Sequence, residues 1–293
     1  MNLPGSRTVS IRLGLFLASF ALIALSLAPR ATAEQWTKSY PVANRPQLHV
    51  SVDDASVRIT TGDTKQVDIR VDYNGYTLDK NLRVEGRQDG DRVELTVRTS
   101  NHWNFTWGKN AHTIRVEIRM PSNGDLQVES GDGSVETDAV TGKVDIKTGD
   151  GSISLNGVKG DIRVHTGDGS IHGNDLDGNL EATTGDGSMS ITGRFDSLNL
   201  KTGDGSINAQ ARAGSKIVSG WTVHTGDGSV DLVVPSDLQA NIDASTSDGH
   251  ISLGIPVTVE GSLSTSQIHG KMNGGGQPLS IHTGDGSIRL SKS

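Results

Sequence analysis

The sequence predicts an all-β fold, specifically a parallel β-helix, or solenoid, with about 18 residues in each coil. Three observations lead to this prediction. A short motif returns at a fixed spacing, apolar residues alternate with polar ones, and many of the 37 glycines stand at fixed positions in the repeat. Hydrophobic residues make up 33% and aromatic residues 4% of the chain, which is low for a thick globular core. Helix is expected to be nearly absent outside an N-terminal leader.

The repeated motif is Gly-Asp-Gly-Ser, which first occurs at residues 131–134. Its aspartate returns every 18 residues over the first five copies and at looser spacing afterwards, at Asp132, Asp150, Asp168, Asp186, Asp204, Asp227, Asp248 and Asp285. The last interval has room for one further row, and we expect that row to carry Gln267 in place of the aspartate.

Apolar residues between the motifs fall into columns when the rows are aligned. The columns are Val135, Ile153, Ile171 and Met189; Val144, Ile162, Leu180 and Leu198; and Ile146, Val164, Ala182 and Leu200. Their strand neighbours are mostly polar, so each row is expected to form two short strands with apolar side chains facing inward. Stacking parallel rows about 4.8 Å apart aligns these columns into a continuous core. The period does not determine the handedness, and we expect a right-handed coil.

The chain divides into three predicted parts. Residues 1–33 are expected to be a secretory signal peptide, because Arg7 and Arg12 precede an apolar run at 13–28 and a cleavage site at 31–33. An uncleaved membrane anchor is the alternative. Residues 34–120 are expected to form strand-rich N-terminal coils and a cap, and residues 121–293 the regular solenoid. The parts at 34–120 and 121–293 are expected to form one continuous domain without a membrane span.

Composition excludes several function classes. The chain has no cysteine, so it has no disulfide, no acylated lipoprotein cysteine and no thiol nucleophile. Because the leader holds three arginines and no acidic residue, its removal lowers the formal net charge from −7 to −10. Such an acidic chain is not expected to bind nucleic acid.

The motif aspartates have two interpretations. In the first, the motif is a turn: glycine supplies a positive φ and the aspartate accepts a backbone N–H two residues on. Basic residues three positions upstream would then offset the repulsion between stacked carboxylates, at Lys147, His165, Lys201, His224 and His282. In the second, the ladder binds cations, weakly or as calcium sites, through Asp132, Asp150, Asp168, Asp186, Asp204 and Asp227. We favour the turn and expect no cofactor.

An aromatic segment interrupts the strand pattern. Trp103, Phe105 and Trp107 fall on alternate positions and would form a stripe along one face of a strand. The stripe is expected either to bind a sugar or a protein partner, or to cover the open end of the solenoid.

The repeat, exemplified by Gly151-Ser152-Ile153, resembles a bacterial family together with the strand-rich segment before it, the Met120-Pro121 junction and the leader. It is the putative-adhesin, β-strand-repeat family, a domain of unknown function, and the resemblance covers about residues 48–290. The resemblance implies an exported parallel β-helix associated with the cell envelope and supplies no catalytic residues.

The resulting functional prediction is a non-catalytic adhesion or scaffold module whose ligand is an envelope glycan or a protein. It is expected to be periplasmic, exposed on the cell surface or secreted. The alternatives are an enzyme acting on polysaccharides, a calcium-binding repeat protein, and an envelope-stress component that contacts another protein. Uniform repetition of the aspartates, the absence of a distinct Ser-His-acid triad and the irregular histidine spacing disfavour catalytic and metal sites.

Overall fold

The computed structural model of the chain describes residues 34–43, 45–100, 112–259 and 264–293. Within these ranges every regular element is a β-strand, which confirms the all-β class. The described residues belong to one compact unit, Ala33–Ser293, and contain no helix that is long and apolar enough to cross a membrane. The predicted signal peptide and the stripe of Trp103, Phe105 and Trp107 lie outside the described residues.

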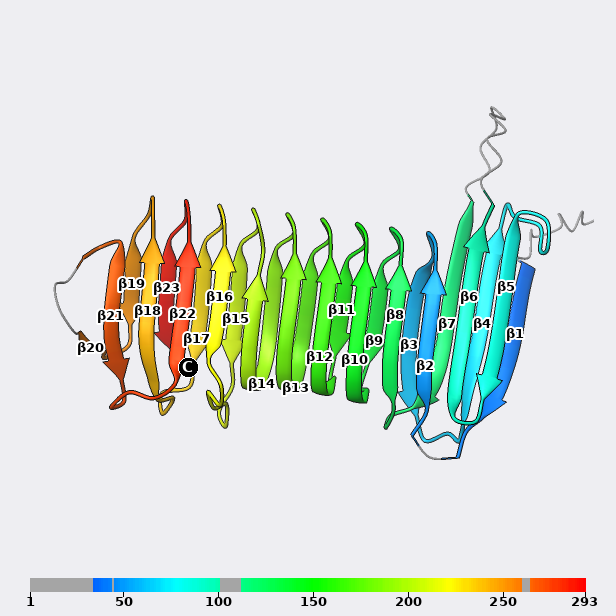
Figure 1. Cartoon of the computed structure of the whole chain (residues 1–293), viewed down its shortest axis with the longest axis horizontal. Coiled ribbons are helices and arrows are strands. Elements are labelled where there is room, and N and C mark those ends of the chain that lie inside the picture. The colour runs from blue at the N-terminus through cyan, green and yellow to red at the C-terminus, as the bar shows by residue number, and fades with distance from the viewer. Residues whose placement is uncertain (1–33, 44, 101–111, 260–263) are drawn as a thin grey trace, which may run out of the picture. The chain divides into compact units, whose positions relative to one another are not determined.

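The strands form two faces that enclose the core, called face A and face B (Figure 1). β13 (Ile171–Thr184) and β14 (Met189–Lys201) are long enough to contribute to both faces. In spatial order, face A contains β5 (Leu82–Asp89), β6 (Arg92–Thr99), β2 (Gln47–Val52), β8 (Asp125–Ser130), β10 (Thr141–Thr148), β12 (Lys159–Thr166), the second halves of β13 and β14, β16 (Trp221–Thr225), β22 (Pro278–Thr283), β18 (Ala240–Thr246), β21 (Gln267–Met272) and β20 (Thr258–Val259).

Face B has the same kind of order. It contains β1 (Glu34–Pro41), β4 (Gln66–Asn74), β7 (Thr113–Pro121), β3 (Ser56–Gly62), β9 (Val135–Asp138), β11 (Ile153–Asn156), the first halves of β13 and β14, β15 (Ile207–Ala211), β17 (Val230–Val234), β23 (Ile288–Lys292) and β19 (Ile251–Gly254).

Parallel pairing in the regular region matches the repeat in the sequence. Thr141 pairs with Lys159 on face A and Ile153 pairs with Ile171 on face B, so partners stand one repeat apart. This register places equivalent apolar residues on top of one another. The column of Val144, Ile162, Leu180 and Leu198 is at most 3% exposed, and the other two predicted columns are equally buried. The core is thus a stack of short apolar ladders.

The first coil does not lie at the N-terminal end of the stack. β2 and β3 are placed between the row of β6 and β7 and the row of β8 and β9. Beyond that row, β4 and β1 extend face B as antiparallel strands, and β5 extends face A in the same way. β1 also packs on β5, where a Cβ on Gly86 would lie 2.0 Å from the Tyr40 hydroxyl. This close contact closes the end of the core.

The last coil is enclosed in the same way at the other end. β22 and β23 lie between the row of β16 and β17 and the row of β18 and β19. The expected extra row does not exist, because β21 runs antiparallel to β18 and pairs Gln267 with Ser245. The prediction that Gln267 stands in the aspartate column is therefore wrong. An antiparallel strand at this position satisfies the hydrogen-bonding groups that β18 would otherwise expose.

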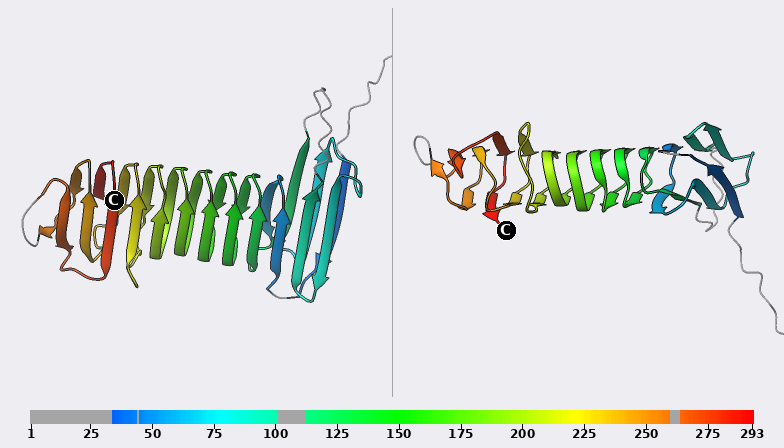
Figure 2. Two further views of the ribbon diagram at one scale, coloured as in Figure 1. Left: turned by 45° about the horizontal axis from the view of Figure 1, so that its top comes forward. Right: turned by 90° about the horizontal axis from the view of Figure 1, so that it is seen from below.

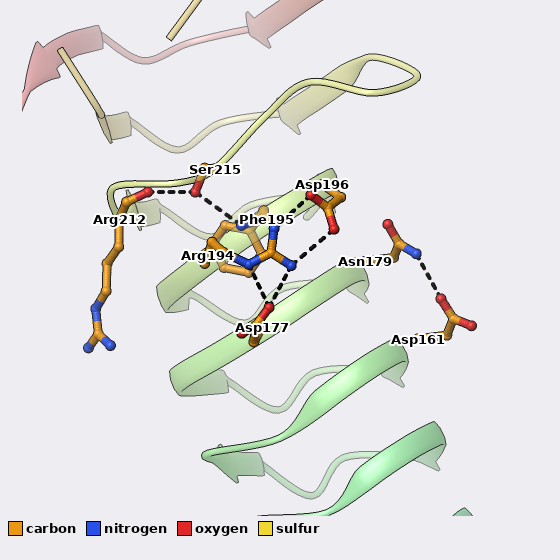
Figure 3. Close-up of polar contacts among 8 residues, drawn as sticks. All are labelled: Asp161, Asp177, Asn179, Arg194, Phe195, Asp196, Arg212 and Ser215. Atoms are coloured by element: carbon orange, nitrogen blue, oxygen red, sulfur yellow. Dashed lines mark hydrogen bonds and ion pairs between the residues drawn. The ribbon is translucent and has the colours of Figure 1, made fainter. Parts of the chain in front are cut away.

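The longest regular row carries its insertion at the corner opposite the Gly-Asp-Gly-Ser motif. There Ser215 Oγ accepts a hydrogen bond from the Phe195 backbone N–H at 3.0 Å and donates one to the Arg212 carbonyl at 2.7 Å. Arg194, on the adjacent strand, binds both Asp177 and Asp196 (Figure 3). These bonds fix the inserted loop against the rows below it.

Candidate functional site

The eight motif aspartates follow one corner of the solenoid, and all of them are exposed. Their order in space departs from the sequence at the end, because the row of Asp285 lies between the rows of Asp227 and Asp248. The corner also has a ninth member, Asp54, because the pairing of Val57 with Val135 places Asp54 level with Asp132. The matching frames Ser56-Val57-x-Ile59 and Ser134-Val135-x-Thr137 were the available sequence signal for this row.

The motif glycines are required by close backbone approach. None of the glycines at 149, 151, 167 and 169 has a positive φ, so the predicted reason for them is wrong. A Cβ on Gly151 would instead lie 2.2 Å from the Gly133 carbonyl oxygen of the neighbouring row. Positive φ is found at the opposite corner, at Gly142, Gly160 and Gly178. Stacking at strand distance leaves no room for a side chain at the motif corner.

A buried threonine holds each motif corner to its neighbour, and its role was missed in the sequence. Thr166 Oγ1 donates to the Gly149 and Gly151 carbonyls of the adjacent row at 3.1 and 2.9 Å, and accepts a bond from the Gly169 N–H at 3.2 Å. The same position in the other rows is at most 6% exposed, and its members are Thr148, Thr184, Thr202, Thr225, Thr246 and Thr283. A threonine before every Gly-Asp-Gly was the signal.

The motif carboxylates themselves have no protein partner in the described part of the chain. No hydrogen bond or ion pair joins Asp132, Asp150, Asp168, Asp186, Asp204 or Asp227 to any described residue. The predicted Asp-to-backbone bond and the predicted pairing with the upstream basic column are therefore both wrong. Because these carboxylates are exposed, water solvates them and screens their mutual repulsion.

No group of three or more His, Asp or Glu among the described residues is arranged to hold a metal ion. Calcium binding by the aspartate ladder stays a prediction.

The upstream basic column forms a ladder on face A. The register places Lys201, His224 and His282 on neighbouring strands. The two imidazoles stack with centroids 5.1 Å apart and an interplanar angle of 7°, and Ser245 Oγ lies 2.9 Å from His282 Nδ1. Burial lowers the pKa of His224, and the neighbouring His282 and Lys201 lower it further. Protonation of this stack is thus unfavourable.

A groove of about 450 Å³ lies further along face A, across β10, β12, β13 and β14. Two cross-strand bonds order part of its floor: Asn179 Nδ2 donates to Asp161 Oδ1 at 2.7 Å (Figure 3), and Arg163 Nε donates to Glu181 Oε2 at 2.8 Å. The Glu181 bond raises the pKa of Arg163.

Other polar groups in this groove remain available to a ligand. The side chains of Lys143, Ser197 and Asn199 line it and make no hydrogen bond or ion pair with any described residue. The groove therefore presents a row of donors and acceptors at the strand spacing, about 4.8 Å.

These features define an all-β repeat protein with solenoid-like architecture and polar faces. The chain belongs to the family described as Toastrack DUF4097, whose model matches residues 46–291. This confirms the family expected from the repeat.

Several solved structures resemble the chain at low sequence identity. A putative adhesin from Bacteroides fragilis is 12% identical, with 88% of this chain and 97% of that chain covered and a TM-score of 0.46. A putative lipid binding protein from Parabacteroides distasonis is 14% identical, with 87% and 96% covered and a TM-score of 0.46. A putative cell adhesion protein from Clostridium sporogenes is 13% identical, with 89% and 100% covered and a TM-score of 0.32. No curated protein matches the chain.

Proposed function

We propose that this chain is an exported, non-catalytic binding module of the cell envelope, built as a parallel β-helix with 18 residues per coil. Its ligand is an extended glycan that lies along face A. The observation that supports this proposal is the groove in which Lys143, Ser197 and Asn199 present unpaired polar groups beside the ordered Asp161–Asn179 pair.

The chemistry of the groove suits a polyhydroxyl ligand. Amide, hydroxyl, carboxylate and ammonium groups provide both donors and acceptors, as sugar hydroxyls require. The strands that carry them are fixed by parallel pairing on both sides, so little freedom is lost on binding. Because adjacent rows repeat at one spacing, a polymer can contact several rows at once.

The acids of the groove favour binding over hydrolysis. Glycoside hydrolysis needs two carboxyl groups whose environments separate their pKa values. Asp161 and Glu181 are instead each bonded to a neighbouring side chain of the same face. This arrangement orients side chains for recognition.

A glycan-binding screen on the purified chain tests the proposal. Replacing Lys143 and Asn199 together by Ala is expected to weaken binding by about 10-fold or more, because each lost hydrogen bond contributes about 0.5–1.5 kcal/mol. The matched control replaces Asn208 and Gln210 by Ala, since both are exposed on face B and have no hydrogen-bond partner among the described residues.

Equal affinity of the two double variants would contradict a site on face A, and release of sugar products would establish the enzymatic alternative. The stripe of Trp103, Phe105 and Trp107 stays a prediction for a second contact surface. Loss of binding without unfolding in the triple Ala variant is its test.

A further inference from the structure

A second cavity lies near the N-terminal end of the described solenoid, on the outer side of face B. It has a volume of about 680 Å³ and is lined by residues of β1, β3, β4 and β7. Cavities of this size hold small organic ligands. It forms where the parallel rows give way to the antiparallel strands β4 and β1, which Figure 2 shows turning away from the regular stack.

Arginine dominates the lining of this cavity. Arg58, Arg70 and Arg119 contribute from three neighbouring strands, against the two carboxylates of Asp68 and Glu117. The pairing of β4 with β7 and of β7 with β3 places Glu117 between Arg70 and Arg58. A cationic excess is notable here because the whole chain carries a formal charge of −7.

Most of these charges already have partners. Arg58 lies 3.4 Å from Glu136, and Arg70 lies 2.9 Å from Asp72. Asp68 accepts bonds from Ser39 Oγ at 2.6 Å and from Gln66 Nε2 at 2.7 Å.

Arg119 is the exception. Its guanidinium makes no hydrogen bond or ion pair with any described residue. It lies across Gly62, where an added Cβ would be 2.8 Å from Nη2. The glycine thus leaves space for a guanidinium whose donors are unused.

We propose that this cavity binds the acidic group of a small saccharide, a phosphate or a carboxylate carried by a sugar. Arg119 supplies the two parallel donors that a planar guanidinium offers to such a group, and Arg58 and Arg70 add positive charge beside it. Glu117, which also has no partner among the described residues, accepts a bond from a sugar hydroxyl. The site is on the opposite face from the proposed glycan groove, so neither proposal depends on the other.

Isothermal titration of the purified chain at low ionic strength tests this site, with glucose 6-phosphate, glucuronate and neutral glucose as probes. At least one of the two acidic sugars is expected to bind more tightly than glucose. Arg119→Gln is expected to weaken that binding by about 10-fold or more, since hydrogen bonds to charged groups contribute about 1.5–3 kcal/mol. Arg119→Lys keeps the charge but loses the paired donors, and an intermediate affinity is expected.

Arg115→Gln is the matched control, because Arg115 is exposed on the same strand and the same side and is absent from the cavity lining. It is expected to leave the affinity unchanged. Equal losses in Arg115→Gln and Arg119→Gln, or acidic sugars that bind no better than glucose, would overturn the proposal. Phosphatidylglycerol vesicles form a separate arm: binding to vesicles with no binding to either acidic sugar assigns the surface to lipid and also overturns it.

Discussion

Thr184 illustrates how one residue joins two coils at the motif corner. Its hydroxyl donates to the Gly167 and Gly169 carbonyls at 3.2 and 2.9 Å and accepts a bond from the Gly187 N–H at 3.3 Å. Aspartate is the more conspicuous residue of the motif, yet it faces water, and the neighbouring threonine carries the contacts between rows.

Thr184→Val is expected to lower the free energy of unfolding by about 1–3 kcal/mol, because a buried N–H and two carbonyls lose a partner while the volume is kept. Urea unfolding followed by circular dichroism measures this loss. Thr183→Val is the control, since Thr183 is only partly buried and makes no hydrogen bond through its side chain to described residues. Equal losses in the two variants would contradict the role given to the threonine hydroxyl.

The sequence was sufficient to locate the motif corner but not to explain it. Glycine at a turn is commonly required for a positive φ, and composition alone does not distinguish that requirement from close backbone approach. The distinction depends on the neighbouring row, whose carbonyl lies 2.2 Å from a Cβ built on Gly169. For the same reason the unpartnered Arg119 was not predicted, because its isolation depends on strands far apart in the sequence.

At the scale of elements, the column of Lys201, His224 and His282 shows how parallel register creates properties that no single strand has. These residues stand on β14, β16 and β22, and the register stacks the two imidazoles on each other. The lowered pKa of His224 means that the folded chain binds a proton at this position less readily than the unfolded chain does.

Stability is therefore expected to fall as pH drops below about 6.5, the ordinary histidine pKa, towards the lowered folded value. His224→Gln removes this component, so its melting temperature should decrease less between pH 7.5 and 5.5 than that of the unchanged chain. His282→Gln should have a smaller effect in the same direction, because it removes only one of the neighbours that lower the pKa of His224. Thermal melts at several pH values check both, and identical slopes in all three proteins would contradict the assignment.

Individual strands were well predicted where apolar residues alternate, as at Val144 and Ile146, because the core ladder fixes both spacing and face. The strands at the ends were not predicted. Gln267 was assigned to a parallel row, whereas β21 is antiparallel, since the direction of an end strand depends on which edge needs a partner.

At the scale of the whole described solenoid, the order of rows in space differs from the order in the chain at both ends. The first coil and the last coil each lie between two others. A regular period predicts how rows stack but not which rows are neighbours when a connection is long, so the looser spacing before Asp285 was the only sequence sign of this arrangement.

Removing residues 278–293 is therefore expected to abolish the cooperative unfolding transition. The deletion removes the partner of four strands and the fully buried side chains of Leu279, Ile281, Ile288 and Leu290. Each is worth about 1.5–3 kcal/mol, so the loss approaches the stability of an entire domain. Differential scanning calorimetry measures this change.

Deleting Glu34–Pro41 is the comparison, because β1 pairs with a single strand, β4, and a folded chain with a lower melting temperature is expected. A cooperative transition in the C-terminal truncation, similar to that of the β1 deletion, would contradict an enclosed position for the last coil.

Because both ends of the described stack are closed by strands that run against the repeat, its extent is set by how many identical rows lie between them. An additional 18-residue unit placed between β11 and β14 would add one strand to each face, one carboxylate to the exposed corner and about 4.8 Å to the distance between the end strands. The region from Gly151 to Gly205 thus acts as a ruler graduated in whole coils, on which the groove of face A and the arginine cavity of face B can be moved apart in fixed steps.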